Sequence, residues 1–368
     1  MSRTKTQHLR AELARLCHRG LDVAELVRRA TAALHGALEF DRSCWHTIDP
    51  ATLMFTGAIK DRFVADPRFP RYEYSVDDVN RFAHLARQPC PADTLSRATG
   101  GHPVQSPRFR DLLERLGIGD ELRVAFVADD NCWGGCALYR DAGSAPFGEA
   151  DVSLMAELSV MLADGFRRAI LVAGLSKEAD DAPGLILLDG HDGIRSITPA
   201  AERLLCGLVE VGISAPGRLP AVVYAVATRA RTAAAAVDSS AVMARARART
   251  TSGEWRVLHG TQLTDAADDT TAVIIERARA AEIAPLIVKA YGLSGRERQV
   301  TRLAVLGLST EEIADRLEVS PLTVQDHLKA IFRKVEVHSR RELVARIFVD
   351  HYEPRIKRGE RPAAAGFF

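Results

Sequence analysis

Two patterns of hydrophobic positions alternate along the chain, one typical of helices and one typical of strands. Residues 8–38 and Glu149–Leu175 place apolar side chains three to five positions apart, which predicts helices. Residues 61–110 are rich in Pro, Arg and Asp and predict loops with short helices, whereas residues 228–252 are only weakly patterned. Shorter apolar, β-branched or alternating runs predict strands at 44–48, 122–128, 132–139, 184–189, 194–197, 255–263 and 271–275.

The pattern from Ser294 to Asp350 is helical throughout and carries clear start signals. Ser followed by Glu three positions later forms a capping box at Ser294, Ser309 and Ser339, and Ser320-Pro321 is an N-cap followed by proline. These signals predict helices at 295–306, 310–317, 321–335 and 340–349. The second and third are so close that they predict a helix-turn-helix. The predicted core is Val300, Leu303, Ala304, Ile313, Ala314, Leu317, Val324, Leu328, Ile331, Val335, Leu343, Val344 and Ile347.

The third of these helices has a polar stripe opposite its apolar face. Gln325, Asp326, Lys329 and Arg333 fall on that stripe. Amide, carboxylate and ammonium groups match the donors and acceptors of the DNA major groove, so the stripe predicts base contacts. Lys334, Arg340 and Arg341 lie beyond it, where they could meet phosphates. The alternative is a small helical bundle with a solvated charged face.

At these residues the sequence resembles the LuxR-type (GerE-like) DNA-binding domain. The resemblance rests on 293-LSGRERQV-300, 307-GLSTEEIADRL-317, 319-VSPLTVQDHLKAIFRK-334 and 339-SRRELV-344. It implies a four-helix domain that places its third helix in the major groove and commonly dimerises through its fourth. Carried over by position, Gln325, Asp326 and Lys329 would face bases, and Thr323, Arg333 and Lys334 would face phosphates. The family usually has Gly or Asn where this chain has Glu336.

The upstream region resembles two sensor modules. Residues 20–178 resemble a GAF domain, through 38-LEFDRSCWHTIDP-50, the 122–139 hairpin and the long helix after it. Residues 183–280 resemble a PAS domain, chiefly through 184-GLILLDGHDGIRSITPAAERL-204. The resemblances imply a multidomain α+β chain, with antiparallel-sheet sensor domains before the all-α helix-turn-helix domain at 288–352. Residues 1–19 would be an N-terminal helical segment and residues 353–368 a loose tail.

One pair of residues in the sensor region could carry chemistry. Cys44 and His46 flank Trp45 on a predicted strand, so the two side chains share one face while Trp45 takes the other. They could form a metal, haem or redox site, or simply be a buried thiol and a hydrogen-bonded histidine. Trp133 could line a pocket or fill the core. Cys132 and Cys136 are too far apart on an extended strand to chelate one zinc ion or form a disulfide. The sequence predicts no metal site.

Composition adds limits to these predictions. The 368 residues, with 49 Lys and Arg against 48 Asp and Glu, suggest two or three domains and exclude a uniformly basic nucleic-acid coat protein. The basic excess is local, between Ser320 and Arg341. No secretory signal or membrane-spanning run is evident, and the six scattered cysteines favour a reducing cytoplasm.

Motifs for ATP binding (GxxxxGK[ST]), for serine hydrolases (GxSxG) and for zinc proteases (HExxH) are missing from the sequence, and no receiver-type acidic pair is present. We therefore expect a cytoplasmic, sequence-specific transcription regulator and not an enzyme. It would bind double-stranded DNA as a homodimer, with a small molecule as a candidate effector and an unknown cofactor. The alternative is a ligand-binding or protein-interaction module that binds no DNA. The 149–175 helix is either a dimer seam or a cover for the sensor sheet.

Overall fold

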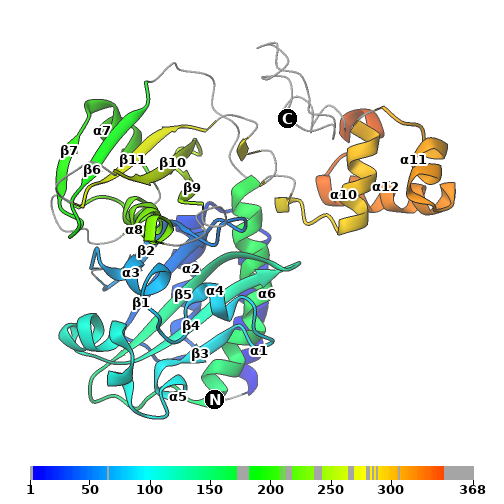
Figure 1. Ribbon diagram of the computed structural model, residues 1–368. Helices are drawn as coiled ribbons and strands as arrows, with labels where there is room; N and C mark the ends of the chain where they lie inside the picture. The colour runs from blue at the N-terminus through cyan, green and yellow to red at the C-terminus, as the bar shows by residue number, and fades with distance from the viewer. Residues whose placement is uncertain are drawn as a thin grey trace. The chain divides into compact units, whose positions relative to one another are not determined.

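The computed structural model describes residues 3–63, 66–171, 182–208, 210–211, 218–235, 243–263, 269–278, 282–283, 286, 289–305 and 307–343. The chain divides into two compact units, Met1–Arg277 and Ala278–Phe368, which are described separately below. Figure 1 shows the first unit with two β-sheets and the second with helices. None of the described helices is long and apolar enough to cross a membrane.

The first sheet of the first unit has the strand order β3-β4-β5-β1-β2-β8. Neighbouring strands in this sheet pair in antiparallel fashion, except β2 and β8, which are parallel. The predicted 122–139 hairpin is confirmed, since β4 and β5 pair along their length. The strands are β1 (Arg42–Ile48), β2 (Phe55–Asp61), β3 (Ala92–Thr94), β4 (Ile118–Ala128), β5 (Asn131–Asp141) and β8 (Glu210–Val211).

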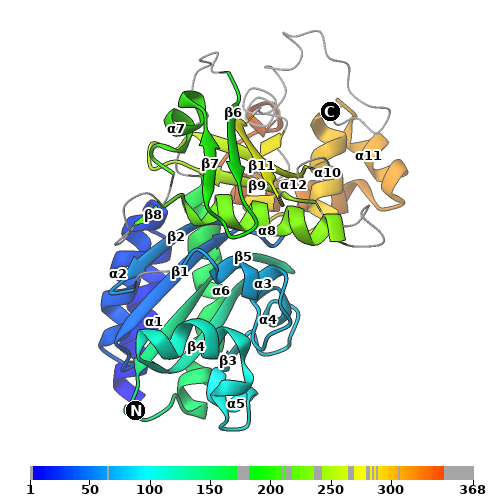
Figure 2. The same ribbon diagram turned by 60° about the vertical axis from the view of Figure 1, so that its left-hand side comes forward.

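Three helices lie on one face of this sheet: α1 (Arg3–Cys17), α2 (Val23–His35) and α6 (Glu149–Leu171). Figures 1 and 2 show α6 running along the sheet. Phe166 of α6 stacks on Trp45 of β1, and Gly165 lies so close to Cys17 of α1 that a Cβ would meet its sulfur at 2.6 Å. The predicted helix is confirmed for 149–171, and it covers the sheet, which was one of the two roles left open for it. Residues 172–175 lie outside the described residues.

The opposite face carries the short helices and loops predicted for residues 61–110. They are α3 (Phe69–Tyr74), α4 (Phe82–Leu85), α5 (Leu95–Ala98) and single turns at Pro103–Gln105, Phe109–Leu113 and Glu114–Leu116. Beneath them lies a buried ion network that the sequence pattern did not indicate. Arg108 and Arg123 share Glu121, at 2.7 and 2.9 Å. Arg123 also binds Glu73 at 3.0 Å. Because these side chains are at most 2% exposed, each needs its partner to remain buried.

The second sheet is antiparallel, in the order β7-β6-β11-β10-β9. Its strands are β6 (Gly184–Leu188), β7 (Ile194–Ile197), β9 (Arg245–Arg249), β10 (Trp255–Gln262) and β11 (Thr271–Arg277), with α7 (Pro199–Leu205) and α8 (Ala221–Ala235) beside them. The strands predicted near 184–189, 194–197, 255–263 and 271–275 are confirmed. The second half of α8 and all of β9 fall in the weakly patterned 228–252 segment, for which no element was predicted.

The two sheets share one hydrophobic core, and α8 joins them. The shared cluster holds Phe55 and Phe82 beside the first sheet, Val226 of α8 and Val273 of the second sheet. A further link is ionic, since Arg247 of β9 binds Asp49 at the end of β1 at 2.6 Å. Residues 1–277 are therefore one compact unit. The predicted boundary near 178–183 falls mostly on residues outside those described.

The second unit contains α10 (Gly295–Val305), α11 (Thr310–Leu317) and α12 (Pro321–Val335). These match three of the four predicted helices to within one residue. Residues 340–343 are also helical. The rest of the predicted fourth helix, with Val344 and Ile347, and the 353–368 tail lie outside the described residues.

Candidate nucleic-acid interface

The helix-turn-helix of the second unit is set by the caps of α11 and α12. Ser309 Oγ accepts a hydrogen bond from the Glu312 amide at 3.2 Å, and a Glu312 carboxylate oxygen accepts from the Ser309 amide at 2.6 Å. The hydrogen bonds from Ser309 hold the pKa of Glu312 below its ordinary value. Ser320 Oγ accepts from the Thr323 amide at 3.1 Å, with Pro321 beginning α12. Each helix therefore starts where its serine satisfies a free backbone amide.

Glutamates in the left-handed conformation end both helices. Glu318 has φ 55° after α11, and Glu336 has φ 56° after α12. Glycine or asparagine would adopt this conformation at lower cost. Glu336 therefore makes a left-handed turn after α12 and is strained in it.

Apolar residues of the three helices meet in one cluster. Of the predicted core residues that the structure describes, all are buried except Leu317, which is half-buried against the cluster. Leu343 is also buried. The buried set is Val300, Leu303, Ala304, Ile313, Ala314, Val324, Leu328, Ile331, Val335 and Leu343.

The opposite side of α12 is exposed and polar. Gln325, Asp326, Lys329 and Arg333 are all exposed, and Lys329 Nζ lies 3.2 Å from Asp326 Oδ1. Thr323 is exposed as well, with its hydroxyl 2.8 Å from that of Ser320. The described structure thus leaves the whole predicted base-facing set accessible on one helix. Their contacts with DNA stay predictions.

Two predicted phosphate partners have contacts inside the unit. Lys334 Nζ donates to Glu297 Oε2 at 2.7 Å and to the Gly292 carbonyl at 3.0 Å. Arg340 donates to the Ala304 carbonyl at 3.3 Å and to the Leu308 carbonyl. Both cations therefore tie α10 to the segments around it, whereas Arg333 and Arg341 are exposed.

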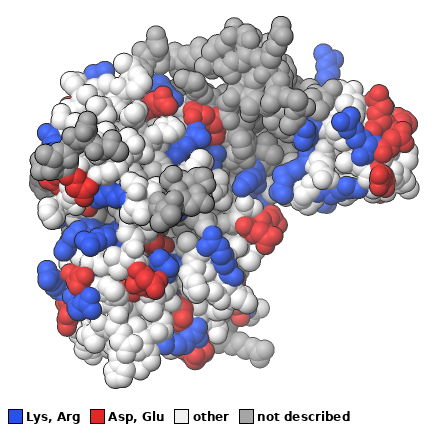
Figure 3. Space-filling view, viewed as in Figure 1, with Lys and Arg blue, Asp and Glu red and all other residues white. Residues whose placement is uncertain are grey.

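Sequence reasoning missed two features of this surface. Leu322, in the first turn of α12, is 65% exposed. The exposed carboxylates of Glu311 and Asp315 give α11 an acidic side, and Figure 3 shows the Asp and Glu side chains gathered there, apart from the Lys and Arg side chains over α10 and α12. Both features could have been found in the sequence. Leu322 stands in the first turn of its predicted helix, and Glu311 and Glu312 are consecutive acidic residues in theirs.

In the first unit, the structure separates the four candidate pocket residues. Cys44 and His46 share a face of β1, with Sγ 3.4 Å from Nε2, and both line a cavity. Trp45 lies on the other face against Phe126 and Phe166. Neither Trp45 nor the buried Trp133 is among the side chains that line this cavity. Burial raises the pKa of Cys44 to about 12, and burial together with nearby Arg123 and Lys60 lowers that of His46 to about 3. Both groups are neutral at neutral pH.

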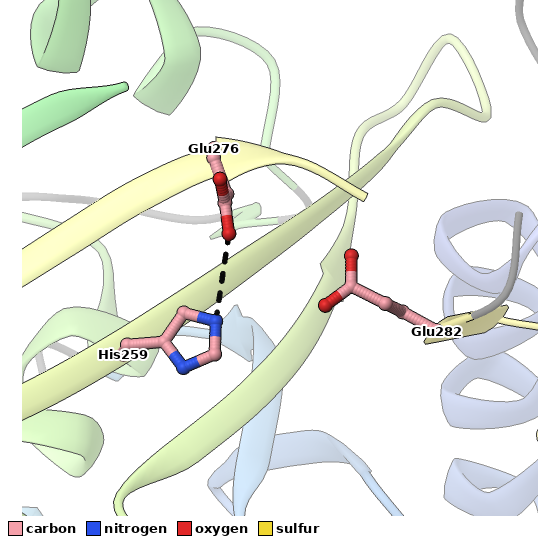
Figure 4. Close-up of side chains that lie close together, drawn as sticks. All are labelled: His259, Glu276 and Glu282. Atoms are coloured by element: carbon pink, nitrogen blue, oxygen red, sulfur yellow. Dashed lines mark ion pairs between the residues drawn. The ribbon is translucent and has the colours of Figure 1, made fainter. Parts of the chain in front are cut away.

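A second histidine pairs with a carboxylate on the other sheet. His259 Nε2 on β10 lies 3.6 Å from Glu276 Oε1 on β11, as the dashed line in Figure 4 marks. Glu282, drawn in the same figure, belongs to the second unit. Two protein ligands are fewer than the three that catalytic zinc sites use, so this pair does not by itself make a metal site.

Comparison with known proteins places the second unit in a family. Residues 292–347 match the model of bacterial regulatory proteins of the luxR family. The chain is 50% identical over 52 residues to an HTH-type transcriptional regulator of Mycobacterium tuberculosis (strain ATCC 25618 / H37Rv), covering 14% of this chain and 6% of that protein. It is 35% identical over 86 residues to the monoamine regulon transcriptional regulator of Klebsiella aerogenes, covering 20% and 38%. The chain thus spans only a small part of these relatives.

Solved structures give weaker likenesses. Escherichia coli SdiA aligns at 12% identity over 94% of this chain and 97% of its own, with a TM-score of 0.29. The Vibrio cholerae VqmA dimer aligns at 14% identity over 47% and 84%, with a TM-score of 0.21. The match over 292–347 agrees with the capped helices and their shared core, and the C-terminal part of this chain is a helix-turn-helix domain of the bacterial LuxR family.

Proposed function

We propose that this chain is a sequence-specific, DNA-binding transcription regulator whose N-terminal unit controls its LuxR-type domain. One observation carries the proposal. The exposed stripe of Gln325, Asp326, Lys329 and Arg333 lies on α12, the second helix of the capped helix-turn-helix. In such motifs the second helix enters the major groove. Gln325, Asp326 and Lys329 would contact bases, while Thr323, Arg333 and Arg341 would contact phosphates.

The N-terminal unit supports a sensor role by its architecture. Its first sheet is antiparallel over five strands and is covered by helices, as expected for a GAF-like domain, and its second sheet of five antiparallel strands is as expected for a PAS-like domain. We propose that the unit receives a signal, for which a small molecule is the candidate. The shared core around α8 gives a physical route by which a change in one sheet would reach the other.

The proposal also includes a homodimer and a cytoplasmic location. A regulator of this type binds two half-sites as a homodimer, because a two-fold protein matches a palindromic operator. The fourth helix is the proposed contact between DNA-binding domains, with α6 as a second candidate seam. Since the target is chromosomal DNA, the proposed location is the cytoplasm.

The test is DNA binding by the full chain. A duplex would be selected from a random library, and its affinity would be measured by fluorescence anisotropy at several salt concentrations. We expect log K to fall linearly with log salt, because phosphate contacts release counterions. A scrambled duplex should bind more weakly by about 10³-fold or more.

The competing function is a ligand or protein-interaction module that binds no DNA. It is favoured if the selection enriches no sequence and if binding at low ionic strength shows no salt dependence. Its support on the molecule is the acidic side of α11, which could receive a basic partner.

A further inference from the structure

One leucine stands on the exposed side of α12. Leu322 is 65% exposed, and among the described residues of the second unit no other large hydrophobic side chain is so exposed. The apolar residues that lie buried in the shared cluster from the same helix are Val324, Leu328, Ile331 and Val335. The domain therefore does not use Leu322 for its own core.

Leu322 lies in the middle of the polar stripe, at its N-terminal end. At about 100° per residue, Leu322, Lys329 and Arg333 point within about 40° of one another around the axis of α12. Gln325 and Asp326 flank this line on either side. A surface that meets the stripe therefore also meets Leu322. In a recognition helix, the N-terminal residues are the ones that reach the base edges.

The first turn of α12 fixes the backbone that carries this leucine. Ser320 Oγ accepts a hydrogen bond from the Thr323 amide at 3.1 Å, and the hydroxyl groups of the two residues are 2.8 Å apart. Pro321 lies between them, and its ring restricts the backbone further. Because Leu322 sits inside this capped turn, its backbone needs no reordering when a partner binds.

The chemistry of an apolar side chain in the major groove points to thymine. The 5-methyl group of thymine is the apolar feature of the base-pair edges there, among hydrogen-bond donors and acceptors. A leucine packed on a donor or acceptor would desolvate it without giving it a partner. We propose that Leu322 contacts the 5-methyl group of a thymine and selects that base at one position of each half-site. This inference rests on the proposed DNA-binding function and adds a base preference to it.

Deoxyuridine is the matched probe, because it differs from thymidine only in lacking the 5-methyl group. In the duplex selected with the full chain, each thymine would be replaced in turn, and the affinity would be measured by fluorescence anisotropy. We expect one position in each half-site where the missing methyl group weakens binding by about fourfold, the effect of burying one such group. Replacing a thymine that no apolar side chain contacts should have little effect.

Three variants test whether the contact is made by Leu322. Leu322→Ala removes most of the apolar side chain and should bind the thymine and deoxyuridine duplexes nearly equally. Leu322→Met keeps an apolar side chain of similar volume and should retain the preference. Lys329→Ala, on the same stripe, should weaken binding to both duplexes and leave their ratio near the expected fourfold value. Because Leu322 is exposed, its variants should unfold at the temperature of the unchanged chain, which thermal unfolding checks.

The inference is overturned if no thymine can be distinguished from deoxyuridine, or if Leu322→Ala keeps the preference. It is also overturned if Leu322→Ala leaves DNA binding unchanged but alters the sedimentation of the free chain, since the leucine then makes a protein contact. In each of these cases the selected duplex still binds with its salt dependence, so the proposed regulator function stands. A selection that enriches no duplex rejects both.

Discussion

The side chains of α12 divide into those that face solvent and those that hold the domain together. Lys329 is exposed and pairs with Asp326, which is also exposed. An exposed pair of this kind contributes little to stability. Both side chains therefore remain available to DNA.

Lys329→Ala should weaken binding to the selected duplex by about 1–3 kcal/mol while leaving the thermal unfolding of the chain unchanged. The reason is that a lost base contact affects only the complex. Anisotropy titrations against selected and scrambled duplexes measure the difference. Equal losses on both duplexes would reassign Lys329 to a phosphate.

Glu336 is a residue whose backbone costs stability. Its φ of 56° is strained for any side chain with a Cβ. Glu336→Gly should therefore stabilise the second unit by about 1 kcal/mol. Urea unfolding of the full chain, followed by hydrogen exchange in peptides from 289–343, reports on this unit. Glu342→Gly, in the helical 340–343 stretch, is the opposite control and should destabilise by about 1 kcal/mol or more, because it also removes the hydrogen bond that Glu342 accepts from the His338 amide. If Glu336→Gly is instead less stable, the glutamate side chain contributes more to stability than its strained backbone costs.

At the scale of elements, one lysine joins the end of α12 to the start of α10. Lys334 donates to Glu297, whose side chain is 8% exposed. Burial would raise the pKa of Glu297, but the hydrogen bonds from Lys334 and Ser294 together hold it below its ordinary value. A carboxyl whose pKa is lowered by folding stabilises the fold above its unfolded pKa. That stabilisation is lost as the pH falls through the folded value.

Lys334→Met should lower the unfolding free energy of the second unit by about 1–3 kcal/mol at pH 7, because Glu297 is left charged without its cation and keeps only its hydrogen bonds with Ser294. The loss should shrink near pH 3, where protonation neutralises Glu297. Urea unfolding at both pH values, read by hydrogen exchange over 289–343, measures it.

Arg333→Met is the matched control one residue earlier. It should leave stability within about 0.5 kcal/mol and reduce the salt slope of DNA binding by about one phosphate contact. If Lys334→Met changed the salt slope and not the stability, the phosphate role that the sequence suggested would replace the structural one.

At the scale of the whole molecule, residues 1–277 behave as one unit because their two sheets share a core and an ion pair. The Asp49 side chain is 1% exposed and binds Arg247 from the other sheet. Breaking a buried pair by removing one partner leaves an uncompensated charge.

Arg247→Met should destabilise the first unit by about 3–5 kcal/mol, and adding Asp49→Asn should restore part of that loss. Arg110→Met, which breaks an exposed pair with Asp111, should cost less than about 1 kcal/mol. Thermal unfolding followed by tryptophan fluorescence, with Trp45 on the first sheet and Trp255 on the second, should show one transition for both sheets. Separate transitions would contradict the single unit.

Local signals in the sequence were enough to predict some features of this chain. Capping boxes and spacing located α10, α11 and α12, and alternation located most strands, because these depend on neighbours a few residues apart. The same spacing placed Cys44 and His46 on one face of their strand and Gln325 and Lys329 on one face of their helix.

Features that depend on residues far apart in the chain became visible only in the folded structure. It gave Lys334 and Arg340 partners more than 30 positions away, and it buried Arg108 and Arg123 with carboxylates from separate segments. It also extended α8 into the weakly patterned 228–252 segment, and it placed Ala225 and Ala227 of this helix in the core that the two sheets share. No local pattern records such contacts, because burial and pairing are properties of the folded chain.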